Sequence, residues 1–185
     1  MKILLLSFLL LFLPRSQAKL VKSLFPSVTP TKIVATVTPS ITASISGAPV
    51  KVDRVVDGDT IKVIIDNKIE TVRLIGVDTP EVVDPRKPVQ CFGKEASEFT
   101  KKLLENQSVI LVSDPTQGNL DKYGRLLRYV YLPDGTLVNQ KIIANGYGHE
   151  YTYRIPYKFQ TQFKDSQKQA ESNNLGLWSP TACQK

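Results

Sequence analysis

Apolar side chains recur at every second position over residues 61–65, and β-branched residues dominate residues 69–77. Both patterns are typical of β-strands, because successive side chains of a strand point to opposite faces. Asp66-Asn67-Lys68 lies between them and predicts a turn short enough to join the two strands as an antiparallel hairpin. Similar patterns predict further strands over residues 51–56, 109–112 and 126–132.

After residue 91 the spacing of apolar residues changes to that of a helix. Four of them follow one another at intervals of 4, 3 and 4, the repeat of one helical face, and these are Phe92, Ala96, Phe99 and Leu103. They predict a helix over 92–106, and two more helices are expected over 137–145 and 157–173. Five short strands and three helices predict the α+β class, and their order fits a five-stranded OB-type β-barrel without singling it out.

The chain has 185 residues, enough for one domain with a substantial core. Its formal net charge is +7, but residues 1–50 contain five Lys and Arg residues and no acid, so the remainder carries only +2. The basic character therefore belongs mostly to the N-terminal part. It is weak evidence for nucleic-acid binding.

The N-terminal segment 1–18 is expected to be a signal peptide. Lys2 precedes an apolar run over residues 3–13, and Ser16-Gln17-Ala18 supplies the small residues that a signal peptidase recognises. Eleven apolar residues are fewer than the ~20 that a membrane-spanning helix needs, which favours cleavage over an uncleaved anchor. The protein is thus expected to be secreted or in the cell envelope, with no stable membrane span after cleavage.

Residues 19–48 are rich in Ser, Thr and Pro and contain no acid, which predicts a flexible linker. A segment that attaches the protein to the cell wall is the alternative. The folded domain is expected over residues 49–185.

Two acidic clusters flank the predicted hairpin: Asp57-Gly58-Asp59-Thr60 before it and Asp78-Thr79-Pro80-Glu81 after it. Antiparallel pairing brings them to the same end, where the carboxylates would repel one another without a cation. Oxygen ligands suit Ca²⁺, and the absence of Cys and His from residues 57–81 argues against zinc. The alternative is a solvated turn whose acids are simply neutralised by Arg73.

The motifs V-D-G-D-T, R-L-I-G-V-D-T-P-E and D-K-Y-G-R resemble those of the staphylococcal (micrococcal) nuclease family, also called thermonucleases. The resemblance extends from about residue 52 to residue 178. It implies an OB-type barrel with three helices. It also implies a secreted, Ca²⁺-dependent endonuclease that hydrolyses phosphodiester bonds of DNA and RNA with low sequence specificity and leaves 3′-phosphate ends.

The resemblance implies a Ca²⁺ site formed by Asp59, Asp78 and the backbone carbonyl of Thr79. It implies that Glu81 orients or deprotonates the attacking water. Arg73 and Arg125 are the implied cations that hold the phosphate and stabilise the transition state, for which the planar guanidinium is well suited. The alternatives are that Glu81 caps a loop and that Arg125 is an exposed surface charge.

Four further residues match positions that line the nucleotide pocket of the family: Lys122, Tyr123, Tyr151 and Tyr153. Tyrosine rings stack on bases without sequence preference. The nearby stretch around His149 is about one residue shorter than in the best-known family member, and a structural role is expected for this lone histidine.

Cys91 and Cys183 are the two cysteines of the chain, and an even number in an exported protein predicts a disulfide. The best-known family member lacks both, so this expectation rests on compartment and number, with two buried thiols as the alternative. A monomer is expected. The alternative function is a non-catalytic OB-type nucleic-acid-binding module displayed at the cell surface, for which loss of the Arg or Glu residues would have been evidence.

Overall fold

The computed structural model describes residues 47–82 and 88–184, all within one compact unit of the chain. The expected signal peptide, 1–18, and nearly all of the expected linker, 19–48, lie outside the described residues. Among the residues that are described, no helix is both long and apolar enough to cross a membrane.

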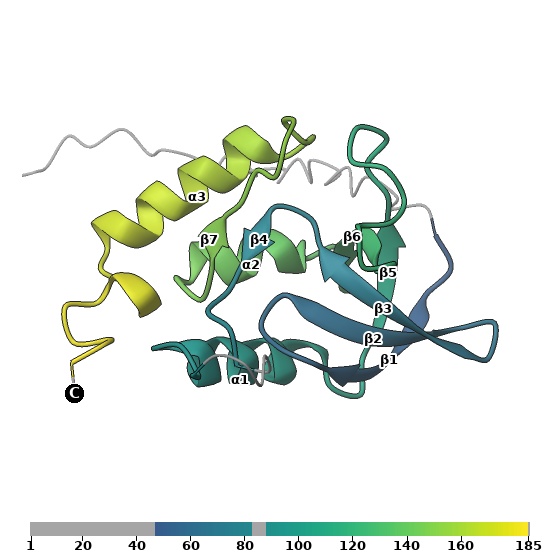
Figure 1. The fold of residues 1–185 in the computed structure, drawn as a ribbon, viewed down its shortest axis with the longest axis horizontal. Coiled ribbons are helices and arrows are strands. Elements are labelled where there is room, and N and C mark those ends of the chain that lie inside the picture. Colours follow the sequence, from purple (N-terminus) through teal and green to yellow (C-terminus); the bar gives the residue numbers. More distant parts are fainter. Residues whose placement is uncertain (1–46, 83–87, 185) are drawn as a thin grey trace, which may run out of the picture. The chain divides into compact units, whose positions relative to one another are not determined.

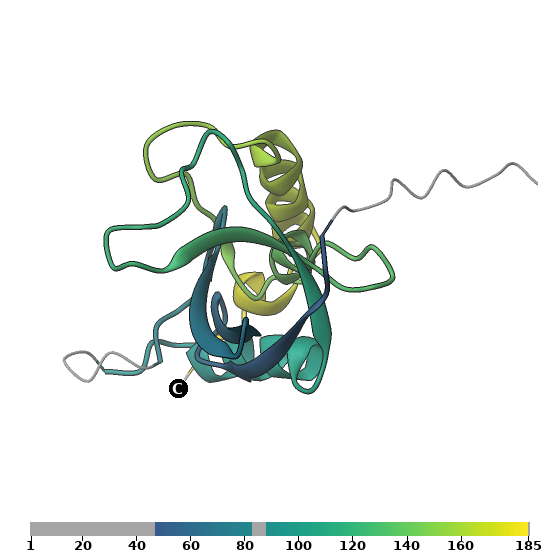
Figure 2. The same ribbon diagram turned by 90° about the vertical axis from the view of Figure 1, so that its right-hand side faces the viewer.

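Five strands close into a barrel in the order β1-β2-β3-β6-β5 (Figures 1 and 2). Their bounds are Val50–Val55 for β1, Thr60–Ile65 for β2, Lys68–Leu74 for β3, Ser108–Val112 for β5 and Leu126–Tyr131 for β6. Neighbours are antiparallel except β3 and β6, whose parallel pairing closes the barrel. The predicted five-stranded OB-type barrel is confirmed.

The predicted turn joins β2 and β3 as a hairpin, but it is two residues long, because Lys68, predicted in the turn, is the first residue of β3. Asp66 and Asn67 adopt φ of 49° and 61°, the left-handed conformation of hairpin turns that match the twist of the strands. The resulting register pairs Thr60, the first residue of β2, with Arg73 near the end of β3. Asp59, one residue before Thr60, is thereby placed beside Arg73.

The prediction of one continuous strand over 69–77 is wrong. β3 ends at Leu74, the chain turns at Gly76 with φ of 75°, and a separate strand β4, Val77–Asp78, pairs with β7, His149–Glu150. Asn139 Nδ2 donates to the Ile75 carbonyl at 2.9 Å, which draws the chain away from the hairpin. The Tyr157 ring covers Gly76 so closely that a Cβ there would lie 2.5 Å from it, so only glycine fits.

Three α-helices surround the barrel: α1 at Gly93–Leu104, α2 at Val138–Ala144 and α3 at Gln160–Ser172, with a short 3₁₀ helix at Gly176–Trp178. In Figure 1, α1 lies below the barrel and α3 on the side of β4 and β7. The core includes Tyr129, Phe163 and Leu104, all with no exposed surface. α3 begins three residues later than predicted, because Tyr157 packs on Gly76 and the Lys158 N–H bonds to Asp114.

Candidate active site

The turn between β1 and β2 carries the first acidic cluster. Asp57 Oδ1 accepts a hydrogen bond from the Asp59 N–H at 3.1 Å, and the Thr60 hydroxyl donates to Asp59 Oδ1 at 3.0 Å. Thr100 of α1 donates to the Gly58 carbonyl at 2.7 Å and fixes the turn from below. Both acids of this turn are buried, with 9% of Asp57 and 5% of Asp59 exposed.

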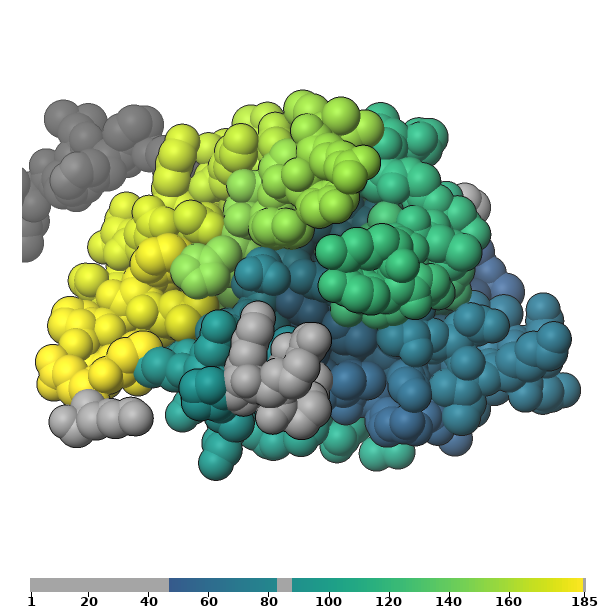
Figure 3. Space-filling view, in the orientation of Figure 1, coloured from purple at the N-terminus to yellow at the C-terminus, as the bar shows by residue number. Residues whose placement is uncertain are grey.

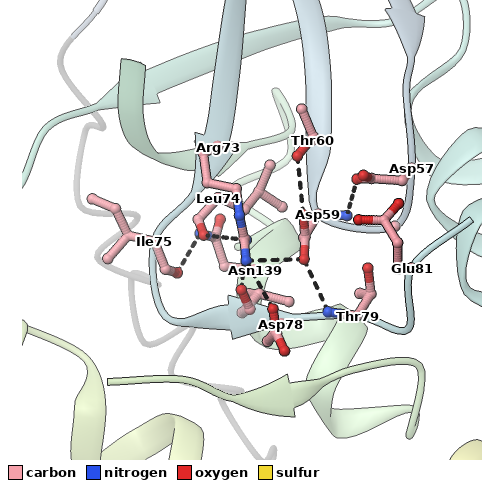
Figure 4. A network of polar contacts seen from close by, with 12 residues as sticks. Asp57, Asp59, Thr60, Arg73, Leu74, Ile75, Asp78, Thr79, Glu81 and Asn139 are labelled. Carbon is pink, nitrogen blue, oxygen red and sulfur yellow. Dashed lines mark hydrogen bonds and ion pairs between the residues drawn. The ribbon is translucent and has the colours of Figure 1, made fainter. Parts of the chain in front are cut away.

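Arg73 joins the two acidic clusters (Figure 4). Its Nη2 lies 3.1 Å from Asp59 Oδ2 and 3.1 Å from Asp78 Oδ1. Its Nη1 donates to the Val77 carbonyl at 2.6 Å and to the Leu74 carbonyl at 3.2 Å. The break after β3 thus creates two carbonyl acceptors that fix the plane of the guanidinium.

Thr79 follows Asp78 and lies against Asp59. Its backbone N–H donates to Asp59 Oδ2 at 2.9 Å, across 20 residues of sequence. The predicted cation ligands Asp59, Asp78 and Thr79 are therefore brought together, although by the β4 segment and not by one long hairpin. His149 pairs with Asp78 across β4 and β7 and packs edge-on against Trp178, with ring centroids 5.1 Å apart.

Burial, and after it the repulsion between neighbouring carboxylates, determines the electrostatics of this cluster. Burial and the neighbouring charge of Asp59 raise the pKa of Asp57 to about 7. Burial and Asp59 also raise the pKa of Asp78, against the opposing effects of Arg73 and His149. One guanidinium therefore leaves the acids under-neutralised, which is a common property of functional sites.

The donor set fits a hard cation. Within the described part of the chain no group of three or more His, Cys, Asp or Glu is arranged to hold a metal ion. The set expected here is smaller, with two carboxylates and one carbonyl, and its all-oxygen composition is the one that Ca²⁺ prefers. The raised pKa of Asp78 indicates that added positive charge would be stabilised beside it.

Glu81 lies next to this cluster, and in Figure 4 its side chain extends toward the Asp57–Asp59 turn. Its negative charge contributes to the raised pKa of Asp78, after burial, Asp59 and the opposing cations. One carboxylate oxygen, Oε1, accepts from the Val82 N–H at 2.9 Å. The Glu81 N–H donates to Gln90 Oε1 at 2.8 Å, so the residue is held by the segment before α1.

Arg125 is not a freely exposed surface charge. Its Nε donates to Asp121 Oδ2 at 2.6 Å, and Asp121 Oδ1 accepts from the backbone N–H groups of Tyr123 and Arg125. Burial opposes ionisation of Asp121, but these hydrogen bonds outweigh it and lower its pKa. The guanidinium lies over the Tyr123 ring, 5.3 Å from its centroid.

A hollow of about 720 Å³ joins these elements. Figure 3 shows the surface indented between the blue β3–β4 segment and the green segments that follow β5 and β7. Of the predicted residues, the lining includes Arg73, Asp78, Lys122, Tyr123, Arg125, Tyr151 and Tyr153. Asp59, Thr79 and Glu81 are not part of its lining.

The tyrosines of the hollow present their rings to solvent, with 71% of Tyr123 and 58% of Tyr153 exposed. Sequence reasoning missed Arg154, whose guanidinium lies 5.0 Å from the Tyr153 ring centroid. It also missed Gln90 and Asn139, whose side chains bond to the segments that carry Glu81 and Asp78. A polar residue in a predicted loop or helix gives no local signal of such a distant partner.

The chain matches the family model described as "Staphylococcal nuclease homologue" over residues 71–180. A thermonuclease from Staphylococcus hyicus is 47% identical over 129 residues, which cover 70% of this chain and 75% of that protein. A thermonuclease from Staphylococcus intermedius is 45% identical over 134 residues, covering 72% and 78%. Endonuclease YncB from Bacillus subtilis (strain 168) is 41% identical over 131 residues, covering 70% and 61%.

Proposed function

Because this chain belongs to the staphylococcal nuclease family, we propose that it is an exported endonuclease that hydrolyses phosphodiester bonds of DNA and RNA with low sequence specificity. The observation that carries the proposal is one hollow whose lining includes the guanidiniums of Arg73 and Arg125 together with Asp78 and exposed tyrosines. Guanidiniums bind phosphate oxygens in pairs, and tyrosine faces stack on any base. Such a surface holds the backbone without reading the sequence.

Two of the cations that line the hollow, Arg73 and Arg125, are oriented before substrate arrives. Backbone carbonyls of Leu74 and Val77 fix the guanidinium of Arg73, and Asp121 fixes that of Arg125. Positive charge held in a fixed position stabilises a transition state better than charge that must reorganise. Both groups act on the negative charge that develops on the phosphate.

Asp59, Asp78 and the carbonyl of Thr79 are the residues that would hold Ca²⁺. When bound, Ca²⁺ acts as a Lewis acid and adds positive charge at the phosphate oxygens. The raised pKa values of Asp57 and Asp78, caused by burial and by the charge of Asp59, support this assignment, since a bound cation would stabilise the ionised acids. Mg²⁺ is expected to substitute poorly, because it demands tighter octahedral geometry than two carboxylates and a carbonyl supply.

Glu81 is the proposed general base. It accepts a proton from water as the water oxygen attacks phosphorus, the P–O5′ bond breaks, and the departing O5′ takes up a proton from solvent. The products are a 3′-phosphate monoester and a 5′-hydroxyl, as the family resemblance implies. The position of Glu81 beside the acidic cluster supports a water bound between them.

The test is cleavage of plasmid DNA and of a long RNA by the purified full-length chain. We expect cleavage with Ca²⁺, little with Mg²⁺ and none with excess chelator, and we expect end-group analysis to find 3′-phosphates. Undiminished cleavage in chelator would contradict the cation assignment. Binding of DNA without any cleavage would instead identify a nucleic-acid-binding module.

A further inference from the structure

Gln90 and Glu81 form two hydrogen bonds, and each residue donates one of them through its backbone N–H. The Glu81 N–H donates to Gln90 Oε1 at 2.8 Å, and the Gln90 N–H donates to the Glu81 carbonyl at 2.9 Å. The two residues are nine apart, so these bonds close the base of the loop between them. The backbone of Glu81 is thereby fixed from one side by a single residue that belongs to the segment before α1.

The segment that carries Gln90 is itself anchored. The next residue, Cys91, forms a disulfide with Cys183, and the two Cα atoms are 5.8 Å apart. Phe92 adopts a left-handed φ of 66° and packs against Tyr147, with ring centroids 5.4 Å apart. Left-handed backbone is unfavourable for an aromatic residue and persists where surrounding contacts impose it. A covalent bond and a ring contact therefore fix the chain within two residues of Gln90.

The first residue of α1 completes the contact. A Cβ on Gly93 would lie 2.6 Å from the Val82 side chain and 3.1 Å from the Glu81 carbonyl, so α1 begins directly against the Glu81–Val82 segment. The Val82 N–H in turn donates to the Glu81 carboxylate. The position of the Glu81 carboxylate thus depends on the backbone of Glu81 and Val82. The position of that backbone depends in turn on Gln90 and on the start of α1.

We propose that Gln90 is a positioning residue for Glu81, and that the Cys91–Cys183 disulfide anchors Gln90 in that role. The proposal rests on the proposed nuclease function for its consequence in turnover, but the contacts themselves are independent of it. Thr79 is held by Asp59 on one side of Pro80, and Glu81 is held by Gln90 on the other. Gln90 therefore holds Glu81 from the side opposite Thr79.

This role is separable from stability, because the Glu81–Gln90 bond is exposed to solvent. Water replaces the lost acceptor at little cost to folding, whereas a carboxylate misplaced by about 1 Å costs up to 10²-fold in rate. We therefore expect Gln90→Met to lower kcat between about tenfold and a hundredfold. KM should stay near the parent value, since the residues lining the hollow are unchanged.

Two variants serve as controls. Gln90→Glu keeps an acceptor oxygen at the same reach and is expected to retain most of the kcat that Gln90→Met loses. Gln169→Met is the same substitution at an exposed position of α3, and its kcat should equal that of the parent. A direct readout is hydrogen exchange of the Glu81 amide by NMR, which should accelerate in Gln90→Met and not in Gln169→Met.

The disulfide is tested with the double variant Cys91→Ser/Cys183→Ser, assayed well below its unfolding midpoint. We expect the same direction of change in kcat and in Glu81 amide exchange. Combined with Gln90→Met it should lower kcat little further, because both changes release the same contact. Full additivity would show that the disulfide acts elsewhere and would overturn the anchoring role.

Unchanged kcat and unchanged Glu81 amide exchange in Gln90→Met would overturn the positioning role. Failure of the parent protein to cleave DNA or RNA would contradict the nuclease function instead. In that case the amide exchange still decides whether Gln90 holds Glu81.

Discussion

Asp114 and the acidic cluster beside Arg73 lie in opposite electrostatic environments. Asp114, 1% exposed, accepts four hydrogen bonds: from the Tyr129 hydroxyl at 2.6 Å, the Lys158 N–H at 2.8 Å, and the Thr116 N–H and hydroxyl at 2.9 and 2.8 Å. Burial would raise its pKa, but these bonds outweigh burial and lower it. At the other site, three acids near Arg73 include two, Asp57 and Asp78, whose pKa values are raised.

The difference separates a carboxylate that stabilises the fold from the carboxylates for which we propose a cation-binding role. Asp114 joins the loop after β5 to Tyr129 of β6 and to Lys158, two residues before α3, and all four hydrogen bonds come from within the domain. The cluster of Asp57, Asp59 and Asp78 keeps more negative charge than Arg73 neutralises. A cation or phosphate-bound cation would relieve that repulsion, whereas nothing further is needed at Asp114.

The largest expected effect is at the reactive side of the acidic cluster. Glu81→Gln removes the proposed base while keeping its size, so kcat should fall on the order of 10²–10⁴-fold. Unfolding free energy should change little, in contrast to variants of Asp114. Single-turnover cleavage with saturating Ca²⁺ and DNA measures the rate, and urea unfolding measures the stability. A parental rate would remove Glu81 from the mechanism.

Ca²⁺ should raise the unfolding free energy through the acidic cluster beside Arg73 and not through Asp114. At a Ca²⁺ concentration one hundred times Kd, the parent should gain about 2.7 kcal/mol in unfolding free energy over the protein in chelator. Asp59→Ala should lose most of this gain, because a charged ligand is removed, whereas Asp114→Asn should keep it. Urea unfolding with and without Ca²⁺ makes the comparison. An equal gain in Asp59→Ala would place the cation elsewhere.

Asp114→Asn should cost about 2 kcal/mol of stability at neutral pH, because charged acceptors contribute more than neutral ones. The lowered pKa fixes the sign of the pH dependence: the contribution is present above the ordinary value of 3.8 and is lost as pH falls through the folded-state pKa. The difference in unfolding free energy between the parent and Asp114→Asn should therefore decrease below about pH 4. Asp165→Asn, at an exposed pair of 3.7 Å with Lys168, is the control and should change stability little.

The smallest effect distinguishes charge from geometry at Arg73. Arg73→Lys keeps the cation beside Asp59 and Asp78 but loses the planar fork that bonds to the carbonyls of Leu74 and Val77. We expect a fall in kcat on the order of tenfold, equivalent to about 1.4 kcal/mol, with the Ca²⁺-dependent gain in stability retained. A loss of that gain would show that Arg73 also shapes the cation site.

Much of the fold was predictable because its signals are local. The alternation of residues 61–65 and the Asp66-Asn67 turn specify the hairpin, and its register places Thr60 opposite Arg73. The apolar repeat over residues 92–106 predicts α1 within two residues at each end. The two cysteines, read with the expectation of export, predict the disulfide that is present.

The sequence also predicted that the two acidic clusters meet, but it attributed this to a continuous hairpin, which is only part of the explanation. A continuous hairpin would align the two clusters only at its end, whereas the break at Gly76 and the pairing of β4 with β7 bring Thr79 onto Asp59. The raised pKa of Asp57 depends on burial that no sequence pattern reports. The motifs therefore predicted residues for the proposed site, and the break after β3 brings Asp59, Asp78 and Thr79 together.

By itself the sequence determined the period of each strand and helix, the turn of the hairpin and the residue types gathered in the acidic clusters. Only the tertiary structure decided that Asn139 would hold Ile75, that Tyr157 would cover Gly76 and that Gln90 would hold Glu81. The physical reason is separation along the chain. Periodicity and turn preference act among neighbours, whereas these contacts join residues between 9 and 81 positions apart and exist only once the barrel and helices have packed.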